Sequence, residues 1–247
     1  VEPTGICTQR QLHLGRRAHR ESVAVVQIRN QKSEINSRFS VFIFRMDYAM
    51  SLPVIAITNA STCLTDAQVE AAVPALQRQV SLDFRAYWDL DCQLIVLPKN
   101  NALTSGWWQI SVVDNPDQAG ALGYHELTSH GTPLGKVFAG LDIQCGGSWT
   151  VTLSHELLEM LAAPWINWCA QGSDGKVYAL EVCDAVEADE LGYQIDGVLV
   201  SDFITPAWFE PTQADRVDFK QRISKPLQLA AGAVMVAPNA CEDPRRT

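Results

Sequence analysis

Residues 146 to 165 read GGSWTVTLSHELLEMLAAPW, and this stretch decides the fold around it. Ser148 follows a turn at Gly146-Gly147, and serine is a preferred residue at the N-cap of a helix. On a helical wheel at about 100° per residue, residues 150–163 are apolar over most of the circumference. The remaining polar strip is narrow and contains no Lys or Arg. The pattern therefore predicts a helix that is mostly buried.

The polar strip of this helix carries His155, Glu156 and Glu159. His155 and Glu159 are four residues apart and stack on one face, with Glu156 on the same side. A buried carboxylate without a partner is costly, and a metal cation held by His155 and Glu159 would compensate it. Glu156 would then lie beside a bound water. The alternative is a solvated groove, or pairing of these side chains with Lys and Arg elsewhere, because HExxE alone is a weak pattern.

Length and composition limit the class of protein. The chain has 247 residues, 47% of them apolar, which allows one large domain with a substantial core. The formal net charge of −9 argues against general nucleic-acid binding. No run of apolar residues is long enough to span a membrane, and the first 30 residues lack the apolar region of a signal peptide.

The number and spacing of the cysteines indicate the redox state of the compartment. Seven cysteines, an odd number without a CxxC pair, argue against a disulfide framework and against a cysteine-rich zinc module. They favour a reducing compartment, so a cytoplasmic location is expected. Cys169 and Cys183 are expected to be small buried apolar residues, with a place next to a metal as the alternative.

The charge changes along the chain. Residues 1–49 carry a net charge of +4, which leaves −13 for the rest of the chain. This segment also lacks sustained periodicity, which predicts a poorly ordered extension or translated sequence upstream of a start at Met50. The alternative is a basic arm that binds an acidic partner. Residues 50–247 are expected to form the folded domain.

Regular elements begin after Pro53. Thr65-Asp66 is expected to cap a helix whose core positions are Val69, Ala72, Leu76, Val80 and Leu82. The predicted strands cover 54–58, 93–97, 107–113, a hairpin of 122–127 and 136–143, and short strands near 176–183 and 192–200. This order predicts an α+β fold with a mixed sheet backed by helices.

The helix with His155-Glu156-x-x-Glu159 resembles that of the zincin metallopeptidases, in the gluzincin arrangement. Those enzymes place an antiparallel edge strand before a helix bearing HExxH, and a carboxylate about twenty residues later supplies the third ligand. The resemblance implies a zincin-like fold over residues 53–210, with 136–141 as the edge strand. Glu181 lies at the spacing of the third ligand.

The resemblance also implies roles for individual residues. His155 and Glu159 would be metal ligands, and Glu156 the general base. Glu181 would be the third ligand, with Asp184 either replacing it or holding His155 through a hydrogen bond. Candidates for stabilising an oxyanion are Tyr178, Tyr193 and His125.

The sequence departs from the family at Glu159, where the family has a second histidine. One His with two carboxylates leaves Zn²⁺ nearly neutral and a weaker Lewis acid, and it tolerates Mn²⁺, Fe²⁺ or Ca²⁺ better. Two functions stay open: a zinc peptidase acting on a peptide or protein, or an inactive zincin-fold scaffold or assembly protein with a structural or lost metal. A chance motif in an ordinary α+β protein is the third interpretation.

Two further groups of residues have both a functional and an unremarkable interpretation. His125 and His130 flank the predicted hairpin and are either ligands or exposed loop residues. Asp184, Glu187, Asp189 and Glu190 form an acidic run that is expected to be a solvated loop, with a structural Ca²⁺ site as the alternative.

Overall fold

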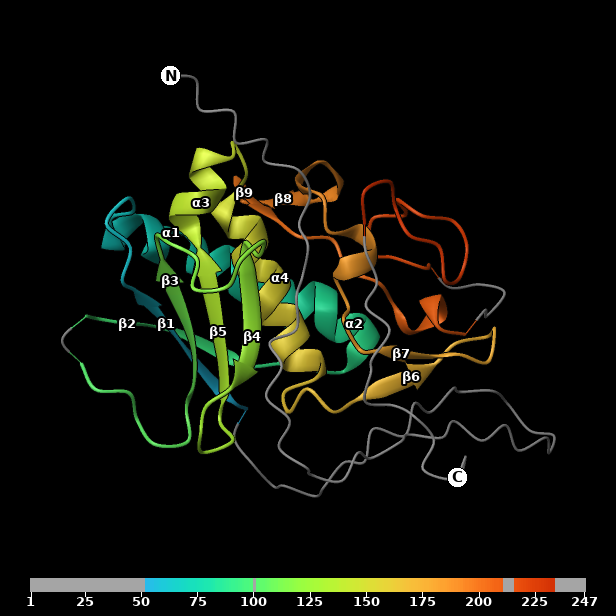
Figure 1. Cartoon of the computed structure of the whole chain (residues 1–247), viewed down its shortest axis with the longest axis horizontal. Helices are drawn as coiled ribbons and strands as arrows, with labels where there is room; N and C mark the ends of the chain where they lie inside the picture. The colour runs from blue at the N-terminus through green and yellow to red at the C-terminus, as the bar shows by residue number, and fades with distance from the viewer. Residues whose placement is uncertain (1–51, 100, 211–215, 234–247) are drawn as a thin grey trace.

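The computed structural model describes residues 52–99, 101–210 and 216–233 (Figure 1). The basic segment 1–49 and its proposed boundary lie outside the described residues. Five strands form the main sheet: β1 (Val54–Asn59), β2 (Gln93–Leu97), β3 (Trp108–Val113), β4 (Gly123–Leu127) and β5 (Pro133–Phe138). The α-helices are α1 (Asp66–Arg78), α2 (Arg85–Trp88), α3 (Ala139–Gln144) and α4 (Trp149–Ala162).

The main sheet is mixed, as predicted. Its strand order is β2-β1-β3-β5-β4. The first four strands in this order run parallel, and β4 pairs antiparallel with β5 at the edge. The mixed α/β architecture and the antiparallel edge strand are therefore confirmed. The prediction that residues 136–141 form the edge was wrong, because β5 lies between β3 and β4.

The second arm of the predicted hairpin is shorter than expected. Strand β5 ends at Phe138, which pairs with Val113, the last residue of β3. The neighbouring strand offers no further ladder partner, and the chain turns into α3 instead of extending to residue 143. Gly140 makes this turn possible, since a Cβ there would lie 2.6 Å from the Asp114 carbonyl oxygen. The largely apolar run 137–143 is thus divided between the end of β5 and α3.

The first helix starts as predicted but changes period. Thr65 and Gln68 form a capping box at the start of α1. After Arg78 the chain continues as a π-helical segment, η1 (Gln79–Phe84), and then as α2. Leu82, predicted to be in the core, is 59% exposed, and Phe84 is fully buried instead. Leu82 lies two residues after buried Val80 and so on the opposite side of the helix, whereas Phe84 lies four residues after Val80 on the same side.

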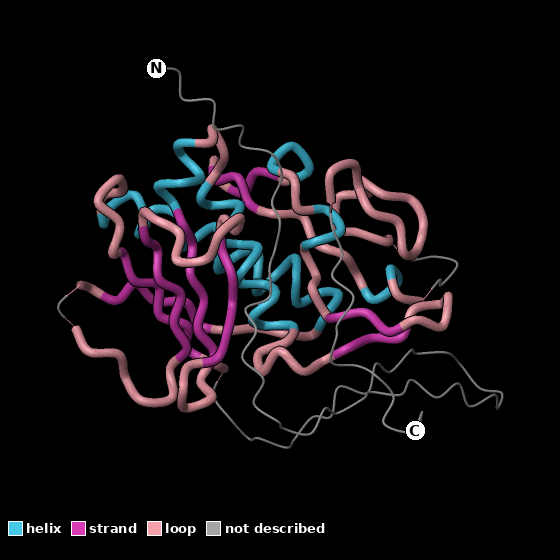
Figure 2. The backbone as a smooth tube through the Cα atoms, viewed as in Figure 1, coloured by secondary structure: helices cyan, strands magenta, loops and turns pink. Residues whose placement is uncertain are grey.

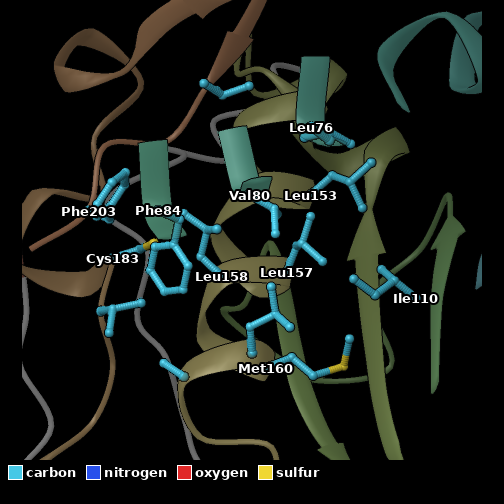
Figure 3. Packing of buried hydrophobic residues seen from close by; sticks show 14 of the residues in the cluster. Leu76, Val80, Phe84, Ile110, Leu153, Leu157, Leu158, Met160, Cys183 and Phe203 are labelled. Atoms are coloured by element: carbon cyan, nitrogen blue, oxygen red, sulfur yellow. The ribbon is translucent and has the colours of Figure 1, made fainter. Parts of the chain in front are cut away.

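Helix α4 lies in the middle of the molecule, between the sheet and the C-terminal segments (Figures 1 and 2). Residues 151–162 of the helix are all buried, which confirms the prediction from its apolar circumference. Figure 3 shows Leu153, Leu157 and Leu158 of α4 in one cluster with side chains from η1, β3 and the C-terminal half. Ser148 is the N-cap residue as expected, but its hydroxyl group makes no capping hydrogen bond.

The C-terminal half is built from short elements. Two hairpins are formed by β6 (Cys169–Gln171) with β7 (Val177–Ala179), and by β8 (Tyr193–Ile195) with β9 (Val198–Val200). Single-turn 3₁₀ helices cover Asp184–Val186, Asp189–Leu191 and Pro206–Trp208. The predicted strand at 192–200 is thus a hairpin, whose turn residues Asp196 and Gly197 both have positive φ. The strand predicted near 176–183 stops at Ala179.

Two findings bear on where such a chain can reside. None of the helices within the described residues is long and apolar enough to cross a membrane. Cys145 and Cys169 are disulfide-bonded, whereas Cys63, Cys92 and Cys183 are free. The expectation that the chain lacks disulfides was therefore wrong, because an odd cysteine count does not prevent some of the cysteines from pairing. The argument for a reducing compartment loses its basis with it.

Candidate metal centre

Helix α4 presents three polar side chains to the interior. His155, Glu156 and Glu159 are each 2% exposed, although His and Glu are seldom fully buried without a partner. Apolar packing of Leu157 and Leu158 on the rest of the helix circumference fixes the direction of this strip. Several ionisable groups are thereby held away from solvent, so their partners within the protein decide whether the arrangement is stable.

His155 faces two carboxylates through the same ring nitrogen. Its Nε2 atom lies 3.1 Å from Glu159 Oε2 and 3.3 Å from Asp184 Oδ1. Among the described residues, neither ring nitrogen of His155 has a hydrogen-bond partner in good geometry. Donor atoms about 2.0–2.1 Å from one tetrahedral cation lie roughly 3.3 Å from each other. The spacing around His155 Nε2 is thus the spacing of ligands around a common ion.

The strongest indication that a cation could bind here comes from Asp184. The residue is fully buried, and neither carboxylate oxygen accepts a hydrogen bond from the described residues. A residue that only oriented His155 would bind the ring nitrogen that faces away from the metal, Nδ1. Asp184 instead approaches Nε2, on the side of Glu159. Asp184 and Glu159 therefore face the same ring nitrogen of His155.

A second histidine reaches the cluster from the edge strand. Alternate residues of a strand point to the same side, and a Cβ at Gly123 of β4 would touch Glu156 and Thr152 on α4. His125, two residues later, points to α4 as well. Its Nδ1 atom lies 3.3 Å from Glu156 Oε2, and its Nε2 atom lies 3.6 Å from Glu181 Oε2.

The segment after β7 completes the cluster. The Cys183 backbone N–H donates to Glu159 Oε1 at 3.1 Å, which leaves Oε2 of Glu159 for the two histidines. The Cys183 thiol is buried near the same side chains, and burial together with the charge of Glu159 raises its pKa well above the usual value. We call His125, His155, Glu156, Glu159, Glu181, Cys183 and Asp184 the central cluster.

The charges of the central cluster perturb one another strongly. Burial would lower the pKa of His125, but the charges of Glu181 and the two helix glutamates raise it to about 10. Burial also opposes protonation of His155, whose pKa is nevertheless raised by Glu159 and Asp184. Burial raises the pKa of Glu159 to about 8, against the effect of His155. Without a metal the cluster thus retains protons, which a bound cation would displace.

The space next to the cluster is small. A pocket of about 10 Å³ lies between the start of β4 and α4, lined among others by Gly123, His155, Glu156 and Glu187. This is the room that one water molecule or ion needs. Ligand pockets for larger molecules typically measure roughly 300–1,000 Å³. The pocket therefore suits an ion or a reacting water but not a whole substrate.

The structure separates the sequence-predicted residues into two groups. His125, His155, Glu156, Glu159, Glu181 and Asp184 come together in the central cluster. Tyr178 does not, because its hydroxyl group donates to Asp174 on the β6–β7 turn. Tyr193 donates to Asp83, and His130 is exposed. The role of Tyr178 in stabilising an oxyanion is therefore not supported.

The acidic run differs from the solvated loop that was expected. Asp184 is fully buried and Glu187 is 3% exposed, because the 3₁₀ turn at Asp184–Val186 directs them inward under α4. Asp189 accepts a hydrogen bond from the Ser148 backbone N–H at the start of α4. A negative charge at this end of a helix is favourable.

Gly123 is a residue that sequence reasoning missed. A Cβ at this position would lie 2.8 Å from both Glu156 Oε1 and Thr152 Cγ2. We expect Gly123→Ala to push α4 away from β4, lower stability by about 1–3 kcal/mol and weaken metal binding. Thermal melting and metal titration measure both effects. Adding Thr152→Ser removes one of the three close contacts and should restore part of the stability, whereas no loss in the single variant would contradict this packing.

The donor atoms fit a divalent cation. His155, Glu159 and Cys183 each offer a ligand atom within 4.8 Å of the other two, and so do His125, Glu156 and Glu159. Within the described residues, the ion pairs of Lys and Arg side chains all lie outside the central cluster. The alternative that these glutamates pair with basic side chains is therefore not what the described structure shows.

Comparison with known proteins gives no relative. The chain matches no protein-family model, no curated protein and no solved structure.

Proposed function

We propose that this protein is a metal-dependent hydrolase, with a divalent cation at the central cluster and Glu156 as general base. The observation that carries the proposal is that Glu159 and Asp184 both face His155 Nε2, while the buried Asp184 carboxylate has no hydrogen bond from the described residues. A divalent cation at this point would acidify water and polarise a carbonyl group. Zn²⁺ is the first candidate, and the oxygen-rich ligand set also suits Mn²⁺, Fe²⁺ or Ca²⁺.

The contacts favour Asp184 over Glu181 as the third ligand. Asp184 lies 3.3 Å from His155 Nε2, the nitrogen that Glu159 also faces. Glu181 instead contacts His125, on the other side of the cluster. The change from the expected ligand follows from the 3₁₀ turn that begins at Asp184 and brings this residue under α4.

Glu156 is placed to act on a water molecule. Its carboxylate lines the water-sized pocket together with His155, and His125 holds Oε2 at 3.3 Å. In this position Glu156 would take a proton from the attacking water, and His155 and Glu159 would only hold the cation. The resemblance of the HELLE helix to zincin peptidases makes a peptide or protein the first substrate class to test.

A structural role for the metal is the second candidate function. The cluster is buried and the adjoining pocket is small, which also suits a protein that binds a metal only to hold its fold. Such a scaffold would need His155, Glu159 and Asp184 but would have no use for a base at Glu156. The two functions therefore differ in the effect of that one side chain.

Metal removal tests the proposal directly. Purified protein reconstituted with about one equivalent of Zn²⁺ is incubated with a mixture of peptides, and cleavage is followed by mass spectrometry. We expect cleavage that a chelator stops and added Zn²⁺ restores, because the proposed chemistry depends on the cation. Cleavage that persists after complete metal removal would contradict the proposal. Metal binding without cleavage of any peptide would favour the scaffold.

A further inference from the structure

The central cluster contains more donors than one cation uses. His155, Glu159 and Asp184 complete one site, and His125, Glu156 and Glu181 remain on the side of β4. The His125 side chain is 8% exposed, and its Nε2 atom has no hydrogen-bond partner among the described residues. The same holds for Glu181 Oε2, which faces it at 3.6 Å. Because Nε2 faces Glu181, the donors that face Glu159 on this side are His125 Nδ1 and Glu156 Oε2.

Glu159 connects the two sides of the cluster. Its Oε2 atom lies 3.1 Å from His155 Nε2 and 3.7 Å from His125 Nδ1. One oxygen atom thus faces a donor nitrogen on either side. Carboxylates take this position between the ions of two-metal sites, where the ions are roughly 3.5–4 Å apart. The donors around Glu159 accordingly form two groups that share only this residue, one with His155 and one with His125 and Glu156.

The charges of the cluster support the same conclusion. Glu156, Glu159, Glu181 and Asp184 bring four carboxylates into the interior, each no more than 8% exposed. Two divalent cations would match these four carboxylate charges, whereas one cation would match two and leave the rest to the histidines. Uncompensated buried charge is costly, and no Lys or Arg of the described residues forms an ion pair with the cluster.

We propose that the protein has a second divalent-cation site, formed by His125 of β4 and Glu156 of α4, with Glu159 shared between the two ions. The inference builds on the proposed metal centre and adds a site to it. An ion bound here occupies the carboxylate of Glu156, so this group cannot take a proton while the second ion is present. The second site would therefore control the first, as a response to the concentration of free metal.

The stoichiometry of metal binding tests the second site independently of any catalysis. Full-length protein is freed of metal, loaded with Mn²⁺ or Zn²⁺, and separated from free ions before elemental mass spectrometry. We expect about two equivalents in the wild type and about one in His125→Ala. His130→Ala, which removes an exposed histidine on the β4–β5 turn, is the matched control and should keep both. If His125→Ala does not fold, His125→Gln keeps most of the side-chain volume for the same measurement.

Electron paramagnetic resonance of the Mn²⁺-loaded protein gives the second measurement. Two ions that share Glu159 should couple magnetically, and His125→Ala should return the spectrum of an isolated Mn²⁺. One equivalent in the wild type, unchanged in His125→Ala, would overturn the second site, and His125 would then be a charged partner of the glutamates. A wild type that binds one equivalent of metal, and loses it in His125→Ala as well as in His155→Ala, would also overturn the second site. Both outcomes leave the proposed hydrolase standing, whereas protein loaded with only about one equivalent of metal that cleaves no peptide would fail the hydrolase alone.

Discussion

Replacing Glu156 with glutamine is expected to abolish hydrolysis while the cation at His155 and Glu159 stays bound. Glutamine keeps the size of the side chain and cannot accept a proton at neutral pH. Loss of a general base lowers rates by about 10²–10⁴-fold. Glu156 is absent from the contacts of His155 Nε2, which involve Glu159 and Asp184, so the ligands of that cation are unchanged. Peptide cleavage, metal content and thermal melting of the variant measure the three parts of the prediction.

Glu126→Gln is the matched control for this change. Glu126 lies on β4 next to His125 but is exposed, so its replacement alters the charge equally without touching the cluster. The control should cleave peptides at the wild-type rate. A Glu156→Gln variant that cleaves as fast as the control would show that Glu156 is not the general base. It would leave the scaffold as the better supported function.

Replacing His155 with alanine is expected to remove the cation and lower the melting temperature by roughly 8–16 °C. Metal at a thousand-fold excess over its dissociation constant contributes about 4 kcal/mol of stability. For a domain of this size, each kcal/mol corresponds to about 2–4 °C. The variant also leaves Glu159 and Asp184 without the imidazole that both now contact. Calorimetry of the metal-loaded wild type and variant measures the difference.

Chelation separates the metal from the side chain in this experiment. A chelator should lower the melting temperature of the wild type toward that of His155→Ala and have a much smaller effect on the variant. The exposed His130→Ala should respond to chelation as the wild type does. An equal response of wild type and His155→Ala to the chelator would show that the metal binds elsewhere.

The sequence predicted α4 and its polar strip correctly because both depend on a periodicity within one helix. A stretch from Val151 to Ala162 with one narrow polar face can only be buried with that face toward a partner. The capping box at Thr65 and Gln68 is equally local and was confirmed. The mixed sheet followed from the order of the elements along the chain.

The parts that the sequence did not predict depend on contacts between distant elements. The pleat and register of β4 place His125 in the cluster, and the tight approach of α4 makes Gly123 necessary. The π-helical segment η1 has no recognised signal in the residues themselves. Tyr178 has a suitable spacing from the helix, but spacing does not determine where a side chain on a short hairpin points.

Elemental mass spectrometry of the purified protein beside His155→Ala tests the central claim most directly, because every proposal here requires a cation at this residue. We expect bound zinc or a related divalent metal in the wild type, and about one equivalent less in His155→Ala. His130→Ala should contain as much metal as the wild type. A wild type that holds no metal after reconstitution, or a His155→Ala variant that holds as much as the wild type, would contradict the metal centre.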